Sequence, residues 1–165
     1  MATSAVSVVV VSLVGIDPGL TGAVAILEDD GSVGVIDMPC VPKSSGKGGE
    51  VCAELLAKAL RESVSRDDRI FVEAVHAMPG NGATSMFGFG RSLGVVLGVL
   101  AALGLPYELV RPMKWKRAAG IVGKPKDASR GAALRLYPAA ADLLKRKKDS
   151  GRADAILIGH YGGGM

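Results

Sequence analysis

Three acidic residues stand in stretches of this chain that are otherwise apolar. Asp17 follows the apolar run 8–16, Glu73 lies inside the run 70–75, and Asp154 begins an apolar helix. An ionised carboxylate in such surroundings requires compensation, and a divalent cation such as Mg²⁺ supplies it through oxygen ligands. Three such acids at strand ends and a helix start are typical of a metal-held nuclease centre, so we predict that they share a metal site.

Each acid also has a simpler interpretation. Asp17 could cap the turn formed by Gly19 and Gly22, Glu73 could face solvent on an edge strand, and Asp154 could be an ordinary acid of a helix N-terminus. One such acid is weak evidence for a metal site. The repetition of the pattern in three separate segments favours the metal site.

The elements that must position these acids follow from hydrophobic periodicity and turn residues. Strands are expected at residues 8–16, 23–27 and 33–38, and the short turns between them predict an antiparallel meander. A helix over residues 51–64 should cover one face of the sheet. Residues 70–75 should form a strand parallel to the first strand.

The second half of the chain is expected to be mainly helical. Its elements are bounded by glycine or proline, and they are a helix at 85–103, a strand at 107–110, and helices at 112–119, 127–137 and 152–161. Asp127 is expected to cap the helix that follows it. Neither repeats nor an interdomain linker are found, so we predict one α/β domain over residues 1–165, with a mixed sheet flanked by helices.

Composition narrows the class of protein. Hydrophobic residues make up 48% of the chain and aromatic residues only 4%, which suits buried strands under Ala-rich helices. The apolar run 6–14 contains two serines and is too short to span a bilayer, so no membrane partner is expected. Cys40 and Cys52 lack the spacing and the histidine neighbours of a zinc site. With no disulfide framework either, we expect a reducing compartment.

The net charge of +4 hides an uneven distribution. Residues 111–152 contain 13 Lys or Arg against Asp127, Asp142 and Asp149, a local charge of +10, so the rest of the chain carries −6. A broad positive field attracts a polyanion such as nucleic acid through counterion release. The alternative is a solvated surface that only keeps the protein soluble, and the charge alone favours that alternative.

Three segments of the chain resemble the RuvC-like Holliday junction resolvases, in their phage and plant-plastid branch. They are Gly15-Ile16-Asp17-Pro18-Gly19, Val72-Glu73 before a long glycine-rich helix, and segment 143–155 with the sequence LLKRKKDSGRADA. The first segment also resembles sugar kinases and actin-like ATPases, whereas the last is specific. The resemblance covers nearly the whole chain. It implies an RNase H-like fold, a homodimer, and Mg²⁺-dependent symmetrical nicking of four-way DNA junctions that leaves 5′-phosphate ends.

The resemblance also implies a catalytic site. The three acids named above match the family's catalytic and metal-binding acids, and two Mg²⁺ ions, replaceable by Mn²⁺, would activate a water for attack on the phosphodiester. Bacterial members carry an Asp or His three residues before the last acid, where this chain has Gly151. We take Asp149 as the fourth catalytic and metal-binding acid, placed before the final helix with Gly151 as the bend. Ser150 is the alternative.

Basic residues near these acids are candidates for DNA contacts. The set that we predict to contact phosphates comprises Lys114, Lys116, Arg117, Lys124, Lys126, Arg130, Lys145, Arg146, Lys147 and Lys148. His76 and Met78 lie in the loop where bacterial relatives insert an aromatic side chain, so we add them to the DNA-binding set. A plain solvated loop is an equal alternative there. Trp115, between two lysines, is expected to pack rather than to stack on a base.

Gly90, Gly94 and Gly98 recur every four residues and give the long helix a flat stripe. Such a stripe permits close packing against the sheet or against a second copy of the chain. We favour the sheet, because the glycine dimer motif of membrane helices does not transfer to other proteins.

These observations favour a crossover junction endonuclease of recombination, repair or phage DNA processing, without a nucleotide cofactor. Kinases and ATPases with a similar first motif need a second domain, for which this chain has no room. Two alternatives stay open: a junction-binding protein without activity, favoured by the missing acid at Gly151, and a nuclease of the same fold that acts on RNA or RNA–DNA hybrids. We expect a cytoplasmic location, or an organelle matrix if a presequence was removed.

Overall fold

A computed structural model of the chain describes residues 11–74, 76, 80 and 82–163. Its main sheet has five strands in the order β3-β2-β1-β6-β7. The strands are β1 (Leu13–Ile16), β2 (Ala23–Leu27), β3 (Val33–Asp37), β6 (Arg69–Glu73) and β7 (Tyr107–Val110). β1, β2 and β3 form an antiparallel meander, whereas β6 is parallel to β1 and β7 is parallel to β6. The predicted mixed sheet is therefore confirmed.

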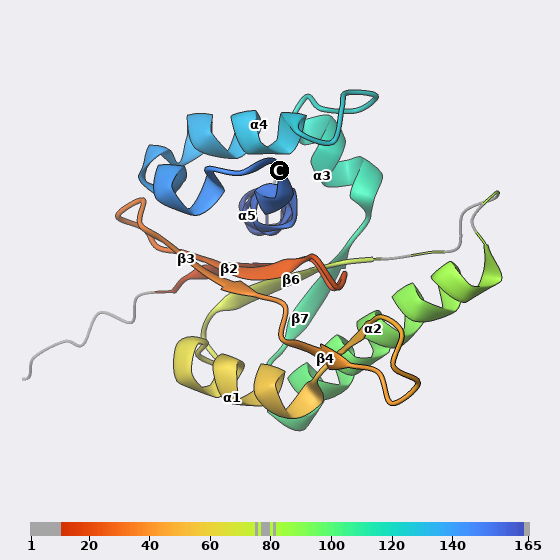
Figure 1. Ribbon diagram of the computed structural model, residues 1–165. Coiled ribbons are helices and arrows are strands. Elements are labelled where there is room, and N and C mark those ends of the chain that lie inside the picture. The colour runs from red at the N-terminus through yellow and green to blue at the C-terminus, as the bar shows by residue number, and fades with distance from the viewer. Residues whose placement is uncertain (1–10, 75, 77–79, 81, 164–165) are drawn as a thin grey trace, which may run out of the picture.

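Helices cover both faces of this sheet. They are α1 (Ala53–Ser63), α2 (Ala83–Ala102), α3 (Pro112–Ala118), α4 (Ala128–Leu136) and α5 (Ser150–Gly162), with the 3₁₀ helices η1 (Pro138–Leu144) and η2 (Lys147–Asp149) before α5. α1 and α2 lie on one face, and α5 lies on the other, where α3 and α4 pack over it (Figure 1). α5 is thus enclosed between the sheet and an outer helical layer.

The two faces of the sheet are built from alternate residues of the same strands. In β2, Ala23, Ala25 and Leu27 belong to the core shared with α5, whereas Val24 and Ile26 belong to the core shared with α1 and α2. This alternation is expected because successive side chains of a strand point to opposite faces. The two alanines occupy little volume, which lets α5 lie close to the sheet.

Two glycines mark the place where α5 crosses β1. A Cβ added to Gly15 would lie 2.0 Å from the carbonyl oxygen of Ala155, and one added to Gly159 would lie 2.9 Å from the backbone nitrogen of Gly15. Both distances are too short for a real side chain. This contact therefore fixes the depth of α5 on the sheet, and with it the position of the helix turn that carries Asp154.

Some local features were not predicted or were predicted wrongly. A hairpin of β4 (Cys40–Pro42) and β5 (Gly49–Val51), which pair antiparallel in a separate two-stranded sheet, was not expected from the sequence. α5 begins at Ser150, two residues earlier than predicted, so Gly151 lies inside the helix and is not a bend. Asp127 precedes α4 in a helical conformation, and its carboxylate accepts a 2.7 Å hydrogen bond from Arg130 instead of capping the helix.

The glycine stripe of α2 does not pack against the sheet. A Cβ added to Gly90, Gly94 or Gly98 would meet nothing within 4 Å, so the expected sheet contact is wrong. The buried side of α2 is formed instead by Ser92, Val96, Val99 and Leu100.

The N-terminal half of α2 projects beyond the rest of the fold (Figure 1). By length and composition alone α2 is apolar enough to cross a membrane, and a single helix of that kind is weak evidence for a span.

Candidate active site at the ends of β1 and β6

The register of the central parallel strands brings Asp17 and Glu73 together. Ile16 of β1 pairs with Val72 of β6, so the next residue along each strand is an acid at the same edge of the sheet. Asp17, together with Glu73, lines one pocket, whose wall on the α2 side includes Ser85 and Phe89. The expectation that separate apolar segments deliver acids to one place is met for this pair.

The turn after β1 holds Asp17 in a fixed orientation. Its backbone N–H donates to the Ala23 carbonyl (3.0 Å), and its carboxylate Oδ1 accepts the N–H of Gly19 (2.9 Å). A Cβ at Gly22 would lie 2.2 Å from the Asp17 carbonyl oxygen, so any larger residue would push the turn away. The glycines of this motif therefore reverse the chain and also allow the backbone to pack closely against Asp17.

Glu73 is held from the side of α3. The indole N–H of Trp115 donates a 3.0 Å hydrogen bond to Glu73 Oε1, and the Trp115 side chain is fully buried. Sequence reasoning predicted that Trp115 packs but missed this contact. The available signal was that Trp115 is the sole tryptophan and that a buried indole N–H usually has an acceptor.

Asp154 reaches the same site from α5. It lies in the second turn of α5, and its carboxylate is hydrogen-bonded by Ser129 of α4. Ser129 is itself 2% exposed, and the Lys126 carbonyl, 3.2 Å from its hydroxyl oxygen, is a second acceptor within reach of its single proton. Ser129 is a second residue that sequence reasoning missed, since a serine at the start of a helix carries no signal of a partner 25 residues later.

Burial raises the pKa of all three acids, and repulsion by Asp17 adds to the increase at Glu73 and Asp154. Burial, then repulsion by Asp17, raises the pKa of Glu73 from 4.5 to about 7. Burial, and to a smaller extent repulsion by the Asp17 carboxylate, raises the pKa of Asp154 from 3.8 to about 6. Burial also raises the pKa of Asp17. Mutual repulsion of this kind identifies neighbouring carboxylates that share a poorly solvated site. A bound cation would relieve both the repulsion and the cost of burial.

Two of the predicted DNA-contacting lysines belong to this site. Lys116 and Lys126 line the pocket with the acids, and the positive charge of each lowers the pKa of Asp17 and of Asp154. Lys116 directly follows Trp115 on α3, while Lys126 precedes α4. The pocket therefore joins two carboxylates to two ammonium groups, with the Asp154 carboxylate close enough to interact electrostatically with both acids, a combination suited to a phosphodiester held by metal ions.

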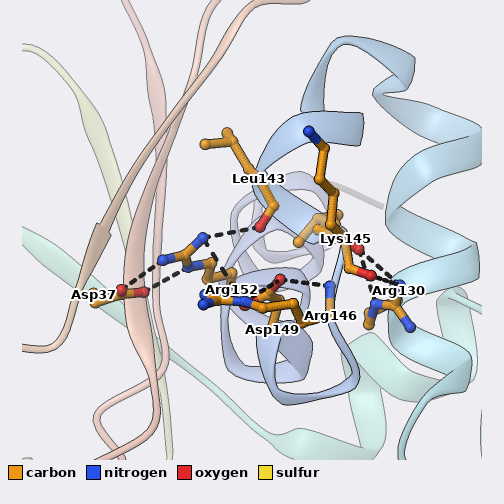
Figure 2. Close-up of polar contacts among 8 residues, drawn as sticks. Asp37, Arg130, Leu143, Lys145, Arg146, Asp149 and Arg152 are labelled. Atoms are coloured by element: carbon orange, nitrogen blue, oxygen red, sulfur yellow. Dashed lines mark hydrogen bonds and ion pairs between the residues drawn. The ribbon is translucent and has the colours of Figure 1, made fainter.

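The structure does not bring Asp149 into this group. Its side chain is 3% exposed, and its carboxylate accepts hydrogen bonds from the backbone N–H of Arg146 (2.8 Å) and from the Arg146 guanidinium (2.8 Å). These bonds hold its pKa below the usual range. Arg152 lies on its other side at 4.0 Å (Figure 2). Asp149 thus lies in an arginine cluster, next to a second pocket that also contains Lys148 and Asp37.

Close packing explains why the chain has glycine at position 151. A Cβ there would lie 1.9 Å from the carbonyl oxygen of Thr21 in the turn that precedes β2. An Asp or His at this position, as in bacterial relatives, cannot be accommodated without moving that turn. Ser150, the alternative fourth ligand, is 6% exposed.

The other predicted DNA-binding residues are distributed over several surfaces. Lys114 and Arg117 line a separate groove with Arg111 and Tyr161. The guanidinium of Arg130 donates to the carbonyls of Leu144 and Lys145, so it braces the chain before α5 (Figure 2).

The remaining members of the predicted set lie at the surface. Lys145 pairs with Asp142 at 2.8 Å, and Lys124, Lys147 and Lys148 are exposed. His76 is exposed, and Met78 lies outside the described residues.

The donors at the three-acid site fit a hard divalent cation. All are carboxylate oxygens, which Mg²⁺ and Mn²⁺ prefer. In the part of the chain that the structure describes, no three His, Cys, Asp or Glu side chains are already gathered as closely as metal ligands. Asp17 and Glu73 line one pocket and Asp154 lies near them, so the three carboxylates would have to move closer together to bind one ion. Cys40 and Cys52 are free thiols and take no part in the site.

Comparisons with known proteins bear on the fold of the chain. No protein-family model matches the chain. Over 89 residues the chain is 37% identical to a protein of Chlamydomonas reinhardtii named "Holliday junction resolvase MOC1, chloroplastic". The aligned part covers 53% of this chain and 10% of the algal protein, so the chain spans about a tenth of that relative's length.

Two solved structures share the fold over 90% of both chains. One is "T. thermophilus RuvC in complex with Holliday junction substrate", with 19% identity and a TM-score of 0.53, and the other is "Thermus thermophilus RuvC structure", with 21% and 0.54. The expected resemblance to RuvC-like proteins is confirmed at the level of the α/β fold.

Proposed function

We propose that this chain is a Holliday junction resolvase, a crossover junction endodeoxyribonuclease that nicks four-way DNA junctions symmetrically. The observation that carries the proposal is the pocket that Asp17 and Glu73 share with Lys116 and Lys126, with Asp154 close enough to interact electrostatically with both acids, in a RuvC-like fold. The algal relative, named as a resolvase, supports the choice of DNA junctions over RNA. The basic segment 111–152 supports a polyanionic substrate.

Mg²⁺ fits the three carboxylates, which would hold two ions, and Mn²⁺ would replace it. When bound, such ions lower the pKa of a water and take up negative charge on the departing oxygen. The protein's own part is to orient the carboxylates. The Gly19 N–H holds Asp17, the Trp115 indole holds Glu73, and Ser129 holds Asp154.

Lys116 and Lys126 have a distinct part in the proposed reaction. Their ammonium groups lie where the scissile phosphate would meet the carboxylates, so they offset the charge that develops on the phosphate oxygens. Asp149 as a fourth ligand stays a prediction, because its carboxylate would first have to leave Arg146.

A homodimer, joined through α2, completes the proposal. Symmetrical nicking requires two active sites, and the projecting end of α2 carries an apolar surface that includes Phe87, 75% exposed, beside the open glycine stripe. Ser85 and Phe89 of the same helix line the acid pocket. A second copy on this face would therefore link the two pockets directly. The proposed location is a compartment that contains DNA, either a bacterial cytoplasm or an organelle matrix.

The test compares wild type with Asp17→Asn on three substrates: a synthetic four-way junction, a linear duplex of the same sequence, and an RNA–DNA hybrid. Each is incubated with Mg²⁺ or with EDTA. We expect paired nicks in the junction alone, with Mg²⁺ alone, and none from Asp17→Asn. Junction binding without cleavage by wild type would favour a non-catalytic binding protein, and cleavage of the hybrid would favour a ribonuclease.

A further inference from the structure

Trp115 connects the packed core to the carboxylates of the site. Its ring is fully buried in the core beneath α5, and its Nε1–H donates to Glu73 Oε1 at 3.0 Å. The two residues are 42 positions apart, so the contact depends on α3 being docked against the end of β6. The polar edge of a core residue therefore faces the reaction centre.

The geometry leaves Glu73 able to bind a cation. An indole has one N–H donor, and a carboxylate has two oxygens with two lone pairs each. The hydrogen bond to Oε1 therefore fixes the plane of the Glu73 carboxylate without occupying Oε2. Packing alone would be satisfied by any bicyclic ring of the same shape, whereas the contact with Glu73 requires the N–H.

We infer that Trp115 is a positioning residue, whose indole N–H orients Glu73 for metal binding. The inference rests on the proposed function, because it takes Glu73 as a ligand. A partner of this kind lowers the cost of forming the site, since the carboxylate is already held in one orientation before the ion arrives. Lys116, the next residue of α3, is carried to the pocket by the same anchoring.

The test uses the fact that the chain has one tryptophan. Expression in a tryptophan auxotroph supplied with β-(3-benzothienyl)alanine replaces the indole N–H by sulfur and keeps the ring shape. The matched control is 5-fluorotryptophan, which keeps the N–H. The readouts are Mn²⁺ affinity of the DNA-free protein by calorimetry, and the melting temperature.

We expect the benzothienyl protein to bind Mn²⁺ about ten-fold more weakly or worse, while the fluorotryptophan protein binds as wild type does. Both should keep a melting temperature close to that of wild type. Equal affinities of the two proteins would overturn the inference. If wild type itself bound no Mn²⁺ and cut no junction, the proposed function would fail instead.

A second measurement needs no altered residue and remains informative if the benzothienyl protein does not fold. The wild-type protein has one indole N–H signal in a ¹H–¹⁵N spectrum. We expect this signal to shift when Mg²⁺ is added, and to stay in place when Mg²⁺ is added to Glu73→Gln. A signal that ignores Mg²⁺ in wild type with a calorimetrically measured Mg²⁺ site would exclude the positioning role.

Discussion

The guanidinium of Arg152 makes two 2.6 Å hydrogen bonds to the carboxylate of Asp37, 115 residues earlier in the chain (Figure 2). A third bond, from Arg152 Nη1, reaches the Leu143 carbonyl at 3.0 Å. Arg152 thereby ties the first turn of α5 to the end of β3 and to the segment before the helix. Because Asp154 lies two residues further along α5, this ion pair supports the frame of the active site.

Removing this ion pair should reduce stability. We expect Asp37→Asn to lower the free energy of unfolding by about 1 kcal/mol, since the pair is bidentate and Arg152 is mostly buried. Asp142→Asn is the matched control, because Asp142 pairs with Lys145 in full solvent and should show no measurable change. Urea unfolding at pH 7 makes the comparison. Because Arg152 lowers the pKa of Asp37, the difference from wild type should disappear as the pH falls through that lowered pKa.

The metal-free protein should lose stability as the pH rises. The pKa of Glu73 is raised from 4.5 to about 7 and that of Asp154 from 3.8 to about 6. An acid whose pKa is higher in the folded state than in the unfolded state contributes its full stabilisation of the folded protein below the unfolded-state pKa. That contribution is lost as the pH rises through the folded-state pKa. The melting temperature in EDTA should therefore fall between about pH 4 and about pH 7. Mg²⁺ should restore it.

Glu73→Gln separates this effect from other causes. The amide keeps an oxygen for Trp115 and removes the charge, so the variant should melt higher than wild type in EDTA at pH 8, with a flatter pH profile. The exposed Glu62 of α1 provides the control substitution, Glu62→Gln, which should follow wild type. A Glu73→Gln protein that melts lower than wild type at pH 8 would contradict the assigned burial and repulsion.

Asp149→Asn and Asp154→Asn should differ in kind. Asp154→Asn should abolish Mn²⁺ binding at ordinary concentrations and leave the fold intact. Asp149→Asn should retain Mn²⁺ binding but lose about 1–3 kcal/mol of stability, because the carboxylate that Arg146 contacts is buried and loses its charge. Calorimetric titration with Mn²⁺ and thermal unfolding distinguish the two. Equal loss of metal affinity would establish Asp149 as the fourth ligand.

Lys116→Ala and Lys114→Ala should have different effects although the residues are two positions apart. Lys116 lines the acid pocket, so its removal should slow single-turnover cleavage about 100-fold while junction binding changes little. Lys114 lines the groove beside Arg111 and Tyr161, so its removal should weaken binding and reduce its salt dependence. Cleavage at saturating enzyme, together with binding in Ca²⁺, checks both. If the two variants showed the same cleavage rate and the same binding, Lys116 and Lys114 would not have separate roles in cleavage and in DNA binding.

Gly94→Glu should produce a monomer. The substitution places a charge in the middle of the open stripe on α2, where a second copy is proposed to dock. Gly131→Glu, on the exposed side of α4, is the control and should remain a dimer. Sedimentation velocity measures the assembly, and junction nicking measures whether the two cuts stay coupled. A wild-type protein that sediments as a monomer at micromolar concentration would remove the basis of the dimer proposal.

The sequence was sufficient for the parts of the site that depend on strand order. Asp17 follows one apolar run, Glu73 lies within another, and the two runs were expected to be parallel strands, so a common location for the two acids followed from the pattern. The Trp115–Glu73 bond and the Ser129–Asp154 bond could not be predicted, because they depend on how helices dock across the fold. No local pattern encodes that docking.

The basic residues and glycines were harder to interpret for the same reason. Arg130 and Lys126 look alike in the sequence, yet Arg130 braces backbone carbonyls and Lys126 faces the acids. Gly151 indicated a bend by residue type, but it lies inside α5 because another segment approaches there. Such roles are set by partners far away in the chain.

The contact between Gly151 and Thr21 also constrains how this protein can evolve. A single codon change to Asp at position 151 would supply a fourth acid, but it would collide with the turn before β2. The turn and the helix start must therefore change together, which makes substitutions at the two places strongly epistatic. A change at position 151 alone would therefore leave the turn and the helix start in steric conflict.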